Sequence, residues 1–183
     1  MSEEMIVRYC SPTLAGMKTG TIFTCPFKDV QDMKESVRYW NRQLRHKGLR
    51  ILPLRKQKNN RFLLYVFRPK HLSKDLQNDT ACKLLRERGY CCENPQHCIV
   101  HLMRRLGESE DFPHEIGLFL GYPPEDVRGF IEKTIPCKCT GCWKVYTDED
   151  AARKTFAKYR KCTAVYRRKF ADGKSIEQLT VAG

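Results

Sequence analysis

The sequence predicts an α+β fold, mainly helical, with a small antiparallel sheet that includes a basic hairpin. Several segments place apolar residues at helical spacing between capping residues. Two strand-like runs, 49–55 and 61–68, flank a polar turn at 56–60. A length of 183 residues suffices to bury one core. We therefore expect a single domain over residues 1–183, and leave open a C-terminal subdomain from about residue 137.

The N-terminal region is expected to begin with a strand at 5–9, followed by a brief helix that Pro12 opens. A second strand is predicted at 21–24. Asp29 then caps a helix that ends at Gly48. Its apolar face comprises Val30, Met33, Val37, Trp40 and Leu44. In the hairpin that follows, Pro53 indicates an edge strand.

The remainder of the chain is predicted to be mostly helical. Helices are expected from Ser73 to Gly89, from Asn94 to Gly107, on both sides of a turn at Gly121, and from Asp148 to Gly173, with a strand at 143–146. The pair around Gly121 has the spacing of a helix-turn-helix. Because its second helix begins Pro124-Glu125-Asp126, carboxylates would face DNA phosphates. These negative charges therefore favour helical packing over DNA binding.

The charge of the chain is strongly positive. It has 34 Lys and Arg against 21 Asp and Glu, a net charge of +13. No acidic residue occurs between Glu35 and Asp75, where the hairpin is predicted. Such a surface attracts an anionic small molecule, nucleic acid or an acidic protein, in a salt-dependent manner. The alternative is a solvated basic face without a binding role.

Ten cysteines occur in a sequence without an export signal. This favours reduced thiols, metal ligands or redox chemistry over a disulfide framework. No window approaches the roughly 20 apolar residues that a membrane span requires. We expect a cytoplasmic protein that does not associate with membranes.

The central motif Pro113-His114-Glu115-Ile116-Gly117, followed by Leu120-Gly121-Tyr122-Pro123, resembles a bacterial family catalogued as domain of unknown function 3793. The resemblance covers nearly the whole chain, and segments 10–20, 65–69 and 143–146 also look like the family. It implies a small cytoplasmic protein of anaerobic Gram-positive bacteria, without an established activity and without catalytic residues to carry over. Relatives, as the resemblance suggests, often have tyrosine at the position of Cys142.

A thiol-centred site is predicted at Cys10 and His114. The expected helix N-terminus at Cys10 would lower the pKa of its thiol. His114, just after Pro113 at another helix start, would act as base or imidazolium partner, with Glu115 or Asp111 orienting the ring. The alternative is that Cys10 is a small buried hydrophobic residue and His114 a helix cap.

Three further side chains would complete this site. Tyr122 and Thr13 could donate hydrogen bonds to a developing oxyanion, and Lys18 could hold an anionic group. The resulting hypothesis is a thiol-centred enzyme or redox protein that acts on an anionic substrate or partner. The alternative is a non-enzymatic protein that binds nucleic acid or an acidic partner.

A metal site is predicted at Cys137, Cys139 and Cys142, because their spacing lets several sulfurs converge on one ion. Zinc is the first expectation and an iron-sulfur cluster the second. The candidates for a fourth ligand are Cys91, Cys92, His97 and His101. The alternative is a cysteine-rich loop whose thiols are simply reduced.

Overall fold

A computed structural model describes residues 1–108 and 112–183, and the chain divides into two compact units. The first unit comprises residues 1–70 and 159–183, and the second comprises residues 71–158. The predicted class is confirmed, since helices predominate and the main sheet is small and antiparallel. The single domain over 1–183 stays a prediction.

The sheet of the first unit contains β1 (Gly20–Pro26), β2 (Arg50–Lys56) and β3 (Arg61–Phe67) in the order β1-β3-β2. Both pairings are antiparallel, and Tyr65 lies opposite Ile22 on one side and Leu52 on the other. The basic hairpin is therefore confirmed as β2 and β3. As Pro53 indicated, β2 is an edge strand, and a register shift lies between Pro53 and Arg55.

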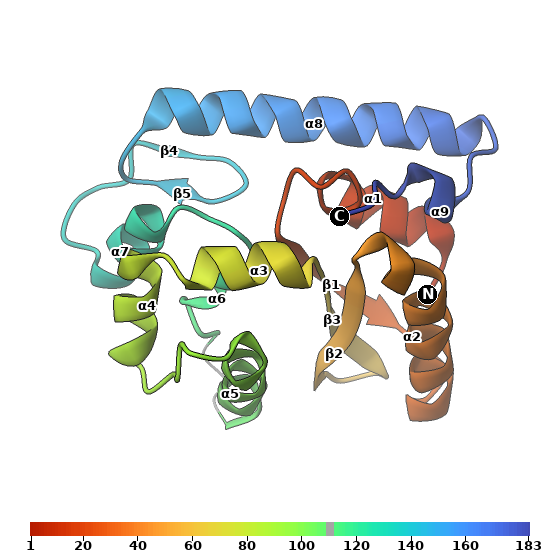
Figure 1. The fold of residues 1–183 in the computed structure, drawn as a ribbon, viewed down its shortest axis with the longest axis horizontal. Coiled ribbons are helices and arrows are strands. Elements are labelled where there is room, and N and C mark those ends of the chain that lie inside the picture. The colour runs from red at the N-terminus through yellow and green to blue at the C-terminus, as the bar shows by residue number, and fades with distance from the viewer. Residues whose placement is uncertain (109–111) are drawn as a thin grey trace. The chain divides into compact units, whose positions relative to one another are not determined.

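The core of the first unit forms where helices pack on this sheet (Figure 1). The helices are α1 (Glu3–Leu14), α2 (Val30–Leu44) and the short α9 (Ile176–Leu179), and a single 3-10 turn, η1 (Arg45–Lys47), follows α2. For α2 the predicted cap is confirmed, because the Asp29 side chain accepts from the amide of Asp32 at 2.8 Å. The core residues without exposed surface are Ile6, Cys10, Leu14, Leu44, Leu49, Ile51, Leu64 and Val66.

The strand predicted at 5–9 is wrong, because α1 already begins at Glu3. The Ser2 side chain caps this helix by accepting from the Met5 amide at 3.3 Å. Glu3 and Glu4 lie in the first turn, where carboxylates favour the positive helix end. Pro12 lies inside the helix instead of opening it. Cys10 is therefore in the C-terminal half of α1 and not at a helix N-terminus.

Arg68, which follows β3, joins distant parts of the first unit. Its guanidinium donates to the backbone carbonyls of Thr13 (2.7 Å), Leu14 (2.7 Å) and Val181 (2.8 Å). The arginine is only 2% exposed, and burial lowers its pKa. Because a buried cation without partners would be very costly, these carbonyls fix the end of α1 and residue 181 beside β3.

The second unit is built from short helices and a two-stranded hairpin. Its elements are α4 (Asp79–Arg86), α5 (Pro95–Glu108), α6 (Ile116–Phe119), α7 (Pro124–Glu132), β4 (Cys139–Thr140) and β5 (Lys144–Val145). Two helices extend across its boundaries, α3 (Pro69–Leu76) and α8 (Glu149–Ala171). Within residues 1–108 and 112–183, no helix has the length and apolar character needed to cross a bilayer.

One continuous helix from Ser73 to Gly89 was expected, and the structure has two. The chain turns at Gln77 and Asn78, and the Asn78 side chain caps α4 by accepting from the Ala81 amide at 3.2 Å. Asparagine is among the preferred residues at a helix N-cap, and a new helix therefore begins after Asn78 instead of the first one continuing. The turn at Gly121 is confirmed, with a φ of 74° that favours glycine.

Candidate functional site

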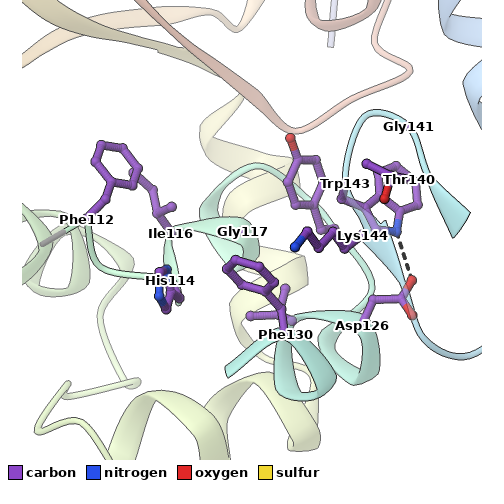
Figure 2. Close-up of a pocket in the computed structure, with 12 residues that line it drawn as sticks. Phe112, His114, Ile116, Gly117, Asp126, Phe130, Thr140, Gly141, Trp143 and Lys144 are labelled. Carbon is purple, nitrogen blue, oxygen red and sulfur yellow. Dashed lines mark hydrogen bonds between the residues drawn. The ribbon is translucent and has the colours of Figure 1, made fainter. Parts of the chain in front are cut away.

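A cavity of about 350 Å³ lies within the second unit, between α6, α7 and the β4-β5 hairpin (Figure 2). We call it the aromatic pocket, because most of its wall is formed by rings and aliphatic side chains. It is lined by Phe112, His114, Ile116, Gly117, Tyr122, Asp126, Val127, Phe130, Thr140, Gly141, Trp143 and Lys144.

Gly117 allows α6 and α7 to approach each other closely at the base of this pocket. A Cβ atom at Gly117 would lie 2.8 Å from Cγ2 of Val127 and 3.1 Å from Cδ2 of Tyr122. Real Cβ atoms essentially never approach another atom as closely as 2.8 Å, so only glycine fits here without displacement of a neighbour. The close approach brings Tyr122 and Val127 into the same wall.

Trp143 forms the hairpin side of the pocket. Its ring stacks on Tyr122 with centroids 5.0 Å apart and meets the edge of Phe156 at 4.6 Å. Phe156, in the first half of α8, belongs to a small core with Val145 and Ala152. The indole is therefore held by two rings of the same unit.

Asp126 fixes Trp143 from helix α7. Its Oδ2 accepts from the indole Nε1 at 2.8 Å, while Oδ1 accepts from the amides of Tyr146 (2.8 Å) and Thr147 (2.9 Å). The Thr147 hydroxyl also donates to Oδ1 at 2.9 Å. The carboxylate is only 2% exposed, and charge-assisted hydrogen bonds compensate its burial. This network joins the hairpin to α7.

Two cationic or ionisable groups face the aromatic pocket beside Phe130. The His114 ring meets the Phe130 ring edge to face with centroids 4.7 Å apart, and the Lys144 amine lies 5.3 Å above the Phe130 centroid. The His114 side chain is exposed, so it can contact a ligand. Figure 2 shows both side chains directed toward the Phe130 ring.

Glu115, the neighbour of His114, is buried in a separate network. Its Oε1 accepts from the Tyr90 hydroxyl at 2.9 Å and lies 2.7 Å from Nε of Arg105. Its Oε2 lies 3.9 Å from Nε of Arg88. Burial, together with the charge of Glu115, raises the pKa of Tyr90. Among the interactions of the described residues, the Glu115 carboxylate is bound to these partners and does not orient His114. Asp111, the other orienting candidate, lies outside the described residues.

Cys10 does not have the surroundings of an activated thiol. It is fully buried in the core of the first unit, and burial raises the pKa of its thiol, an effect that the charge of Lys18 opposes only in part. Thr13 is also buried there, with its hydroxyl 3.0 Å from that of Thr21. The alternative that Cys10 is a small buried hydrophobic residue therefore describes its position. His114 belongs to the other unit.

The three cysteines of the predicted metal site have different environments. Cys137 and Cys142 are exposed, whereas Cys139 packs against the small core around Phe156. Over the described parts of the chain, no three His, Cys, Asp or Glu side chains are arranged to hold a metal ion. A zinc or iron-sulfur site at these cysteines stays a prediction without geometric support.

Two of the candidates for the fourth ligand, Cys92 and His101, have other contacts, whereas Cys91 and His97 are exposed. The Cys92 thiol donates to the carbonyl of Cys82 at 3.3 Å. The His101 ring lies against Tyr90, with centroids 4.1 Å apart. Burial and the charges of two nearby arginines lower the pKa of His101.

The helix-turn-helix interpretation fails on the geometry of its two helices. Helix α6 has only four residues, and Asp126 in the first turn of α7 is covered by the hairpin. A recognition helix must present its first turns to bases, which α7 does not. At the tip of the β2-β3 hairpin, Lys56, Lys58 and Arg61 are exposed. Binding of nucleic acid or an acidic partner there stays a prediction.

Comparison with known families gives one result. The sequence model of a family described as protein of unknown function (DUF3793) matches residues 6–180. The chain belongs to this family. No curated protein and no solved structure matches it. The resemblance to this family is therefore confirmed over nearly the whole chain.

Sequence reasoning placed Tyr122 and His114 in a site, and both line the aromatic pocket of the DUF3793 protein. It missed Phe130, Trp143 and Asp126 as site residues. The signal available for Asp126 was a carboxylate in the first turn of a helix, which ordinarily indicates only a favourable helix dipole interaction. Its indole partner is 17 residues away, and no local pattern reveals that pairing.

Proposed function

We propose that this protein is a small-molecule binding protein whose second unit holds a flat, apolar ring in the aromatic pocket. The proposal depends on one observation, an aromatic wall that is fixed before any ligand arrives. Trp143 is held by Asp126, Tyr122 and Phe156, all within the second unit. A preorganised apolar cavity of this size range is typical of small-molecule sites.

The polar groups of the pocket favour a ligand that also carries a negative charge or a hydrogen-bond acceptor. Lys144 and His114 both lie against Phe130 and can reach a group attached to a ring stacked there. In an otherwise apolar cavity, a small number of polar groups orients the bound ligand and determines which ligands bind. This is in keeping with the anionic substrate or partner expected from the net charge of +13.

Binding without thiol chemistry is the better-supported alternative. The lining residues of the aromatic pocket include no cysteine among those that the structure describes. Cys10 is without exposed surface, and its raised pKa leaves little thiolate near neutral pH. A thiol-centred mechanism would require both properties to be reversed.

Titration with 2-naphthol, followed by ligand-detected NMR, tests the proposal. We expect saturable binding that Phe130→Ala weakens about three- to tenfold, because one stacking partner is lost. Tyr39→Ala removes an exposed ring of the first unit and is the matched control, with binding unchanged. Equal weakening by both variants, or no binding of neutral bicyclic rings to the wild-type protein, would contradict the proposal.

A further inference from the structure

A second cavity, of about 630 Å³, lies in the same unit and differs in chemistry. We call it the basic pocket. It is lined by Arg88, Arg105, Glu108, Phe112, Pro113, His114, Glu115, Ile131 and Lys133. Phe112 and His114 line the aromatic pocket as well. The two cavities therefore adjoin at these two residues.

Among its described lining residues, the basic pocket has three permanent cations and two carboxylates. One carboxylate, Glu115, is 2% exposed and is already engaged by Arg105 and Arg88. The contacts of Glu115 with both arginines use their Nε atoms. A guanidinium has five N–H donors, so terminal donors of Arg105 remain for a ligand. The Arg105 side chain is 38% exposed and accessible to one.

Lys133 adds a cation at the end of α7. It is exposed and adopts a left-handed conformation, with a φ of 53°. Glycine or asparagine is the usual residue at such a helix end. Within the part of the chain that the structure describes, no carboxylate lies within 4.0 Å of its amine. The amine is thus available to an anion in the basic pocket.

We propose that the basic pocket binds the carboxylate or phosphate group of the same ligand whose ring occupies the aromatic pocket. This inference rests on the proposed function and specifies its ligand class, an aromatic acid or an aryl phosphate. Arg105 and Lys133 supply direct donors to the anion. His114, which lines both cavities, contacts the junction between ring and anion.

Glu115 is a positioning residue in this arrangement. Its buried carboxylate lies 2.7 Å from Nε of Arg105 as an ion pair without hydrogen-bond geometry, and this pairing keeps the guanidinium charge at the wall of the basic pocket. Tyr90 holds the carboxylate in turn. The planar group of donors on a guanidinium suits a carboxylate or phosphate better than a halide ion.

Three ligands with one ring system test the inference, namely 2-naphthol, 2-naphthylacetate and 2-naphthyl phosphate. We expect both anions to bind about tenfold more tightly than 2-naphthol, because charge-assisted hydrogen bonds are added. The comparison of the two anions distinguishes a carboxylate site from a phosphate site. Added salt should weaken binding of the anions and leave 2-naphthol unaffected.

The matched variants are Lys133→Gln and Lys154→Gln, since Lys154 is an exposed lysine of α8 that lines neither cavity. Lys133→Gln should weaken anion binding about three- to tenfold without changing the affinity for 2-naphthol. Lys154→Gln should change neither. Thermal unfolding of both variants verifies that the fold is retained.

The outcomes separate this inference from the proposed function. Equal affinity for all three ligands, with no effect of Lys133→Gln, would contradict the anion site but not the binding of a ring in the aromatic pocket. Anion binding that Phe130→Ala does not weaken would overturn the shared ligand, because the basic pocket would then act alone. Absence of binding of all three ligands would overturn both.

Discussion

The indole Nε1 of Trp143 donates a 2.8 Å hydrogen bond to Oδ2 of Asp126. The carboxylate thus connects the first turn of α7 to the hairpin that carries the indole. Because its other oxygen accepts from Tyr146 and Thr147, one buried side chain sets the distance between two walls of the aromatic pocket.

Asp126→Asn should destabilise the protein by about 2–4 kcal/mol, because the charge is lost and an NH₂ group faces the indole N–H. Ring binding should weaken in parallel, since Trp143 loses its anchor. Chemical denaturation and 2-naphthol titration measure the two effects. In a Trp143→Phe background the indole donor is absent, so the same substitution should cost less. An equal loss in free energy of unfolding in both backgrounds would show that the hydrogen bond between Asp126 and Trp143 does not contribute to stability.

Gly117→Ala should destabilise the protein by about 1–3 kcal/mol through overpacking. The added methyl group would lie 2.8 Å from Val127, so α6 and α7 must move apart. The control is Gly107→Ala in α5, where none of the described heavy atoms lies within 4 Å of the added group. There alanine should be neutral or stabilising, because it is the better helix former. Similar losses at both positions would refute the packing argument.

Cys10 should resist iodoacetamide in the native protein. Its burial excludes the reagent and raises the pKa of the thiol, whereas Cys91, Cys137 and Cys142 are exposed. Peptide mass spectrometry after timed alkylation should find these three modified first, and Cys10 modified only after unfolding. Modification of native Cys10 as fast as the exposed thiols would restore the thiol-centred hypothesis.

Acid should destabilise the protein partly through His101. Burial first, and then the charges of Arg104 and Arg105, lower its pKa from an ordinary value of 6.5. The His101 side chain therefore binds a proton more readily in the unfolded chain than in the folded protein. Its contribution to the free energy of unfolding is present above about pH 6.5 and is lost as the pH falls through the pKa of His101 in the folded protein. His101→Gln should show a smaller fall in Tm between about pH 7 and pH 5. His97→Gln, exposed on the same helix, is the control and should behave like the wild type.

Much of the fold could be predicted from sequence because local signals agreed with one another. The helix after Asp29 has a cap, an apolar stripe and a glycine stop, and the hairpin has a polar turn between apolar runs. Residues 5–9 were misread because four apolar residues within five positions, Met5, Ile6, Val7 and Tyr9, fit a strand as well as a helix. The cap at Ser2 decides between them.

The site was predicted less well than the fold. Tyr122 was singled out as a hydrogen-bond donor, but its ring is what forms the wall of the pocket. The expectation at Cys10 depended on a helix start that the structure does not have there. Pairings such as Asp126 with Trp143 arise from tertiary packing and leave no periodic trace in the sequence.

The order of segments along the chain also affects synthesis. Every residue of the second unit is synthesised before α9 and Val181, and Arg68 needs the Val181 carbonyl as a partner. Domains generally fold as units while the chain is being translated. The first unit, which combines residues 1–70 with residues 159–183, can therefore be completed only after the whole second unit has been synthesised.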